Sequence, residues 1–164
     1  MNKTVNNLLR TLEQQESLYN QLVLTAQQQL ELVKSSAFPT TANEAFELVH
    51  KRRQLLTEVE NHGVEAIKLE EVLIGYYGLD DFVLKHFQDR MPFDEYASLV
   101  KQFARLAKVM TELMASDEEL QDVMRHKIEE NKMQPKHDTN LRQVSEVYKS
   151  NPKPPSKNNI DYRK

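Results

Sequence analysis

The amino-acid sequence predicts an all-α protein: an elongated antiparallel bundle, or coiled-coil hairpin, of three long helices with a short C-terminal helix and a mobile tail. Three observations predict this fold. The chain has only three glycines in 164 residues, so few residues suit the tight turns of an all-β fold. Apolar residues recur at steps of three and four, as on one face of a helix. The 29% of charged residues is typical of helices that expose much of their surface.

The first helix is expected over about residues 3–34. Residues of one stripe recur every seven positions, at Val5, Leu12, Tyr19, Ala26 and Val33. This spacing is a heptad pattern, which places one seam of a long helix against a partner. Gln15 and Gln29 fall on the same seam and weaken it. Pro39 cannot continue a helix and therefore ends the segment.

The second helix is expected to begin at Thr40 or Thr41, either of which can cap it, and to end at the segment GYYG, residues 75–78. Gly63 lies in its middle, where a glycine costs about 1 kcal/mol relative to Ala and marks a possible close helix contact. Arg52 shares a seven-residue series with Ala45, Val59 and Ala66. We expect Arg52 to extend from the core edge or to pair across helices.

A short helix is expected over residues 79–90, followed by a third long helix with apolar positions from Tyr96 to Ile128. Ser116 and Asp117 fit a new helix start, but we favour one continuous helix. Pro135 should kink or break it. We expect a last short helix over residues 141–148. The sequence thus predicts a single helical domain over residues 1–149 and a flexible, proline-containing tail over residues 150–164.

The composition argues against proteins that bind nucleic acid, associate with membranes or are secreted. A net charge of −3 does not favour nucleic acid or membrane surfaces, and the absence of cysteine leaves no disulfide or thiolate chemistry. No stretch approaches the roughly 20 apolar residues that span a bilayer, and the N-terminus lacks the apolar segment of a signal peptide. We therefore expect a cytoplasmic protein.

The polar residues form no recognisable catalytic or metal motif. His62 and Glu65 have helical spacing, but a closed metal site needs three or four ligands. Acidic runs at residues 80–81 and 117–119 are read as helix-start carboxylates rather than as acid/base pairs. Lys51, Arg52 and Arg53 splay around a helix and make no continuous basic stripe for nucleic acid. We expect no enzyme, no cofactor and no metal.

Methionines follow the third long helix. They either fill gaps in the core or form an adaptable surface for a partner helix. The later half of this helix has no obvious full-length partner, so its apolar residues need cover from residues 141–147 or from another chain. The residues of this predicted partner surface are Met110, Met114, Leu120, Met124 and Ile128.

Three segments of the chain resemble the flagellar type III export chaperones, the FliT-like and FlgN-like families. These are the first helix, LLRTLEQQESLYNQLVLTAQQQLELV, the second-helix segment AFELVHKRRQLLTEVENH, and the ending LRQVSEVYKS…NNIDYRK. The ending is the most specific: a Leu-x-x-Val helix, a Tyr at Tyr148, a polar spacer and an Ile-Asp-basic terminus. Pro135 and the segment GLDDFVLKHFQDRMPF depart from the family pattern.

The resemblance implies a chaperone that binds a C-terminal helix of a flagellar hook-junction or filament-cap protein and delivers it to the export apparatus. It also implies that the last helix can mask the client site. Carried over to this chain, it adds four client-binding residues to the surface named above, namely Leu141, Val144, Val147 and Tyr148. A self-associating structural coiled coil or adaptor without a client, including a homodimer, is the alternative. A helical enzyme or metal-binding bundle is a third possibility.

Overall fold

The computed structural model describes residues 2–35 and 42–132, which form four helices and, within these ranges, no strand. The helices are α1 (Lys3–Lys34), α2 (Ala42–Tyr77), α3 (Leu84–Phe87) and α4 (Phe93–Lys132). The all-α prediction is therefore confirmed. The predicted caps at residues 40–41, the break at Pro135, the last short helix and the tail lie outside the described residues.

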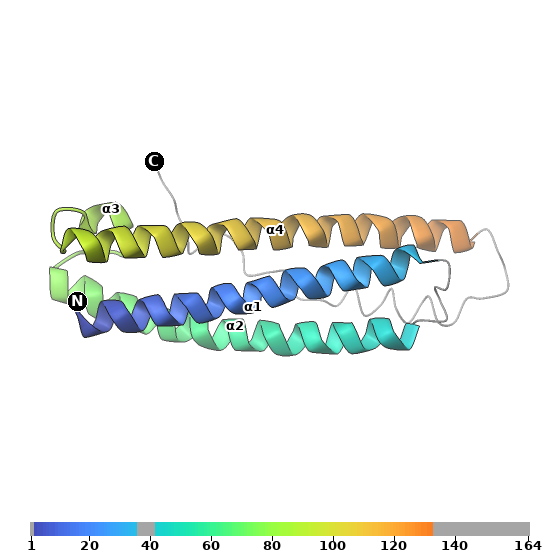
Figure 1. Ribbon diagram of the computed structural model, residues 1–164, viewed down its shortest axis with the longest axis horizontal. Coiled ribbons are helices and arrows are strands. Elements are labelled where there is room, and N and C mark those ends of the chain that lie inside the picture. Colours follow the sequence, from blue (N-terminus) through green and yellow to red (C-terminus); the bar gives the residue numbers. More distant parts are fainter. Residues whose placement is uncertain (1, 36–41, 133–164) are drawn as a thin grey trace.

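Helix α1 is the central element of the bundle. It runs between α2 and α4, antiparallel to α2 and parallel to α4, and each of these two long helices packs along it (Figure 1). A helix between two partners must bury a wide arc of its surface, and the heptad residues at both ends of α1 are fully buried, from Val5 to Val33. The first turn is capped by the Asn2 side chain, which accepts a 2.9 Å hydrogen bond from the Thr4 N–H.

The two glutamines on the α1 seam are buried and take polar partners on α2. Gln15 Nε2 donates to the Val59 carbonyl oxygen at 3.4 Å, beside Gly63. A Cβ atom at Gly63 would lie 3.5 Å from the same nitrogen, an ordinary contact distance. Gly63 thus lies where α1 and α2 meet, as the sequence predicted, although the contact leaves room for a methyl group.

Helix α2 ends at Tyr77, and the next residue, Gly78, has the left-handed backbone conformation with φ +62°. The N–H of Leu79 then donates to the Ile74 carbonyl oxygen at 3.0 Å, which closes the helix end in the manner of a Schellman motif. A residue with a Cβ atom is strained at such a φ, so this glycine is the one that the turn requires.

The segment between α2 and α4 has less helix than the sequence predicted. Instead of a helix over residues 79–90, only α3 is helical, and Val83 before it is extended. Phe82 and Phe87 explain the difference, because both turn into the core: their ring centroids are 5.1 Å apart, and Phe82 lies 5.8 Å from Phe103 of α4. A regular helix is given up so that two aromatic side chains fill the closed end of the bundle.

Helix α4 is continuous over its 40 residues, so the prediction that Ser116 and Asp117 do not start a new helix is confirmed. Its buried apolar residues belong to two clusters. The large one joins α1, α2, α4 and the α3 segment, while a small one at the other end of the bundle contains Val33, Leu120 and Met124.

Candidate functional site

The small apolar cluster at the far end of α4 contains two of the predicted client-binding residues. Leu120 and Met124 are 2% and 4% exposed and pack with Val33 in the last turn of α1. Lys34 Nζ lies 2.7 Å from Glu119 Oε1 and shows that α1 reaches this level of α4. The sequence predicted that these residues need cover from the C-terminal helix or another chain; the structure corrects this for Leu120 and Met124, which the last turn of α1 covers.

The end of α4 extends past this cluster. Figure 1 shows the last turns of α4 extending beyond the ends of α1 and α2. Residues 125–132 add about 12 Å of helix at 1.5 Å per residue. Ile128 lies on this extension, one turn after Met124, and remains half-buried. The apolar stripe of α4 therefore continues one turn past the small cluster.

The other predicted client-binding residues are placed elsewhere. Met110 is half-buried and packs against the large core cluster. Met114 is 42% exposed and lies on the outer face of α4. The structure thus brings together Leu120 and Met124, places Ile128 next along the stripe, and separates Met114 from them. The residues predicted in the last short helix, Leu141, Val144, Val147 and Tyr148, lie outside the described residues.

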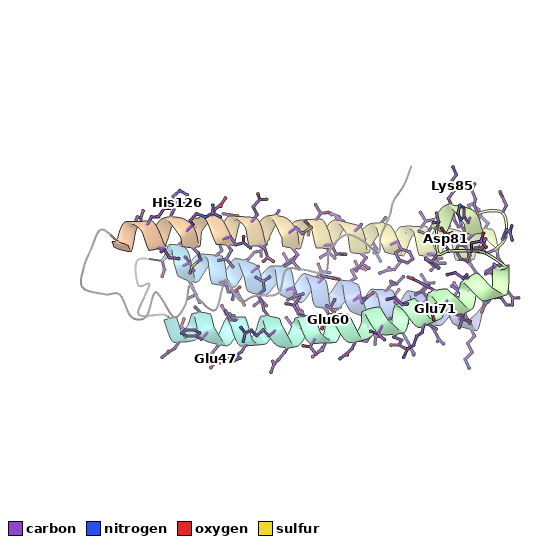
Figure 2. All side chains as sticks on the ribbon, turned by 180° about the vertical axis from the view of Figure 1, so that it is seen from behind. Glu47, Glu60, Glu71, Asp81, Lys85 and His126 are labelled. Atoms are coloured by element: carbon purple, nitrogen blue, oxygen red, sulfur yellow. The ribbon has the colours of Figure 1, made fainter. Side chains whose placement is uncertain are left out.

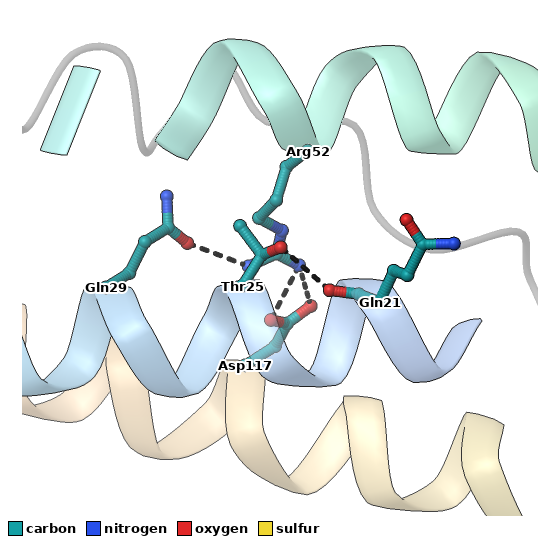
Figure 3. A network of polar contacts seen from close by, with 5 residues as sticks. All are labelled: Gln21, Thr25, Gln29, Arg52 and Asp117. Atoms are coloured by element: carbon teal, nitrogen blue, oxygen red, sulfur yellow. Dashed lines mark hydrogen bonds and ion pairs between the residues drawn. The ribbon is translucent and has the colours of Figure 1, made fainter. Parts of the chain in front are cut away.

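A buried ion pair crosses the bundle just before the small cluster (Figure 3). Arg52 of α2 is 4% exposed, and its Nη2 atom lies 2.7 Å from both carboxylate oxygens of Asp117 on α4. Its Nη1 atom donates to Oε1 of Gln29 on α1 at 3.3 Å. One guanidinium therefore links all three long helices. The predicted pairing of Arg52 across helices is confirmed.

Arg52, Asp117 and Gln29 form a polar layer across the bundle, and this layer corrects one interpretation of the sequence. The sequence predicts a helix-start carboxylate at Asp117, as at Glu118 and Glu119, but Asp117 lies in the middle of α4 and neutralises Arg52. Gln29 was considered only a weak point of the heptad seam, yet it is fully buried and binds the same guanidinium. The polar layer lies between the large and the small apolar cluster.

An open groove lies between α1 and α2 at the same end of the bundle. Its lining combines leucine side chains with carboxylates, an arrangement that suits a segment with both apolar and basic side chains. Glu47, labelled in Figure 2, is one of the exposed carboxylates there. The lining residues are Gln28, Glu31, Leu32, Glu44, Glu47 and Leu48.

Two of the described histidines make local contacts with carboxylates. His86 Nδ1 lies 3.0 Å from Asp81 Oδ1, and His62 Nδ1 lies 3.7 Å from Glu65 Oε2. Asp81, on the segment before α3, is solvent-exposed (Figure 2). Within residues 2–35 and 42–132, no three His, Asp or Glu side chains are placed to hold a metal ion.

The titration of one carboxyl group is strongly perturbed. Burial of Glu70 on α2 raises the pKa of its carboxyl to about 7. Burial also raises the pKa of the Tyr19 hydroxyl on α1. Neither group belongs to the polar layer or to the small cluster, so both bear on stability rather than on the candidate site.

Replacing Glu70 by Gln is expected to stabilise the protein at alkaline pH. Because the folded pKa of about 7 lies above the unfolded value, the native state binds more protons between pH 4.5 and 7, and stability falls as pH rises through this window. Glu70→Gln removes that loss, about 3 kcal/mol at pH 8, and changes little at pH 4. Urea unfolding at both pH values measures it. Glu71→Gln, at the exposed neighbouring position, should show no such pH-dependent gain.

No helix among the described residues combines the length and the apolar character that crossing a bilayer requires. A scan against protein-family models and searches of curated proteins and of solved structures found no match to this chain.

Proposed function

We propose that the protein is a cytoplasmic flagellar export chaperone. It binds an amphipathic C-terminal helix of a hook-junction or filament-cap protein and delivers it to the type III export apparatus, without a cofactor. The observation that carries the proposal is the apolar stripe of α4, in which the half-buried Ile128 follows the small cluster of Leu120 and Met124 by one turn. The resemblance of the sequence to the FliT-like and FlgN-like chaperones supplies the class of client.

The chemistry of this stripe suits helix recognition. Leu120, Met124 and Ile128 are four residues apart, so they follow one side of α4. Leu120 and Met124 are already buried against Val33, whereas the half-buried Ile128 presents an anchor to a helix laid along this end of α4. Met124 has an unbranched, polarizable side chain that adapts its packing when a helix docks beside it. The carboxylates of the groove between α1 and α2 favour a client helix that also carries Lys or Arg.

Residues 141–148 compete with the client in this proposal. Lid and client would bury the same stripe, so only one of them docks at a time. Deletion of residues 141–164 should then increase the affinity for the client. These residues lie outside the described part of the chain, and the proposal for them rests on the sequence.

Replacing Ile128 by Glu is expected to weaken client binding at least tenfold, because it places a carboxylate in the apolar interface. The probes are synthetic peptides with the C-terminal helices of the hook-junction proteins and of the filament-cap protein from the same organism. Calorimetry with the full chain measures their affinities. Gln121→Glu is the matched control, since Gln121 is exposed on another side of α4 and should bind as the unmodified chain does.

The outcome that overturns this function is an unmodified chain that binds none of these peptides, provided that circular dichroism shows it folded. Equal affinities of the Ile128→Glu and Gln121→Glu variants would instead remove the α4 stripe from the proposal.

A further inference from the structure

The outer face of α4 carries three exposed large apolar residues in one line. Phe93, Val100 and Met114 are 79%, 38% and 42% exposed. They are separated by seven and fourteen residues, and the half-buried Ala107 fills the missing step. The buried Leu99, by contrast, packs into the core from another side of the helix. Helix α4 therefore has a second apolar stripe that its own bundle does not cover.

Small residues form the other half of this stripe. Ala97, Ala104 and Thr111 are exposed and also recur every seven residues. Each follows a residue of the first row, Phe93, Val100 or Ala107, by four positions. The two series together make a heptad seam about 30 Å long over residues 93–114. We name this surface the outer seam. One of its rows consists mostly of large side chains, and the other only of small ones.

We propose that the outer seam binds the same seam of a second copy of this chain, with the two α4 helices antiparallel. In an antiparallel helix pair, each row of one helix faces the other row of its partner, so Phe93 and Val100 meet Ala or Thr. In a parallel pair, like rows face each other, and Ala97 would meet Ala97 across an empty layer. The sizes of the side chains thus select the antiparallel copy, which a two-fold axis relates to the first.

The outer seam is separate from the proposed client surface. The seam ends at Met114, whereas the client stripe begins at Leu120 and lies on the side of α4 that faces α1. Both surfaces can therefore be occupied at once. The dimer does not depend on the proposed function, since it needs no client and no export apparatus.

The mass of the full chain in solution tests the dimer. Sedimentation at micromolar concentration should give about twice the 19.2 kDa of one chain, and Val100→Glu should reduce it to that of the monomer. Leu24→Glu is the matched control, because Leu24 is a 59% exposed apolar residue on α1, outside the seam. A monomeric unmodified chain at all concentrations overturns the proposal, as does equal dissociation by both variants.

Crosslinking tests the direction of the pair. The chain has no cysteine, so single-cysteine variants report one position each. With a bismaleimide, Ala104→Cys near the two-fold axis should link to its own copy. Phe93→Cys should not link to itself but should link to Thr111→Cys in a mixture of the two. Self-linking of Phe93→Cys would show parallel helices and overturn the antiparallel arrangement.

Discussion

Replacing Asp117 by Ala is expected to lower the free energy of unfolding by about 3–5 kcal/mol. The carboxylate is the anionic partner of the Arg52 guanidinium, whose Nη2 atom lies 2.7 Å from both of its oxygens. Arg52 is only 4% exposed, so water cannot replace the lost partner without a change in structure. The variant would hold a buried positive charge with Gln29 as its remaining polar contact.

Urea unfolding at neutral pH measures this loss. Asp122→Ala is the matched control on the same helix, because Asp122 pairs with Arg125 at the surface, where the two side chains are 55% and 66% exposed. Such an exposed pair contributes at most about 1 kcal/mol. A loss for Asp117→Ala as small as that of the control would contradict the buried role of the pair.

The double variant Arg52→Met/Asp117→Leu separates charge from packing. It removes both charges and fills the layer with apolar side chains, so its stability should lie within about 1 kcal/mol of the unmodified chain or above it. The ion pair would then serve mainly to select one alignment. A heptad seam can slip by seven residues with little loss of apolar contact, but any slip of α4 separates Asp117 from Arg52.

The long helices are predictable from the sequence because their signals are local and repeated. The heptads of α1 run without interruption from Val5 to Val33, so the predicted range, residues 3–34, coincides with the helix. The continuity of α4 follows from apolar spacing that persists on both sides of Ser116. The segment around α3 depends instead on tertiary contact: Phe82 and Phe87 pack against rings of α2 and α4, and no local pattern specifies that geometry.

The candidate site was predictable in part. Leu120 and Met124 follow from the apolar stripe of α4, and a cross-helix partner for Arg52 follows from its place on a heptad. The choice of Asp117 as this partner depends on the axial position of α4 relative to α2. Helix periodicity does not determine that position. The outer seam is not predictable from apolar spacing alone, because Val100 directly follows Leu99 in the chain and the spacing does not determine which of the two faces the core.

Replacing Phe87 by Ala is expected to lower the free energy of unfolding by about 3–5 kcal/mol, as a fully buried aromatic side chain is lost. Phe87 is 0% exposed, and its ring centroid lies 5.6 Å from that of Tyr77 and 5.1 Å from that of Phe82. If the segment before α4 is part of the core, then this loss should appear in the single cooperative transition of the whole bundle.

Tyr76→Ala provides the control for this last prediction. Tyr76 is an aromatic residue of the same end of the bundle and touches Tyr77, but it is 71% exposed, so its removal should cost less than about 1 kcal/mol. Urea unfolding followed by circular dichroism compares the two variants. If the segment around α3 did not contribute to the core, Phe87→Ala would lower the free energy of unfolding as little as Tyr76→Ala does. A large effect on Phe87→Ala alone would place the four-residue helix α3 among the elements that stabilise the long helices, because its aromatic side chain closes the end of their shared core.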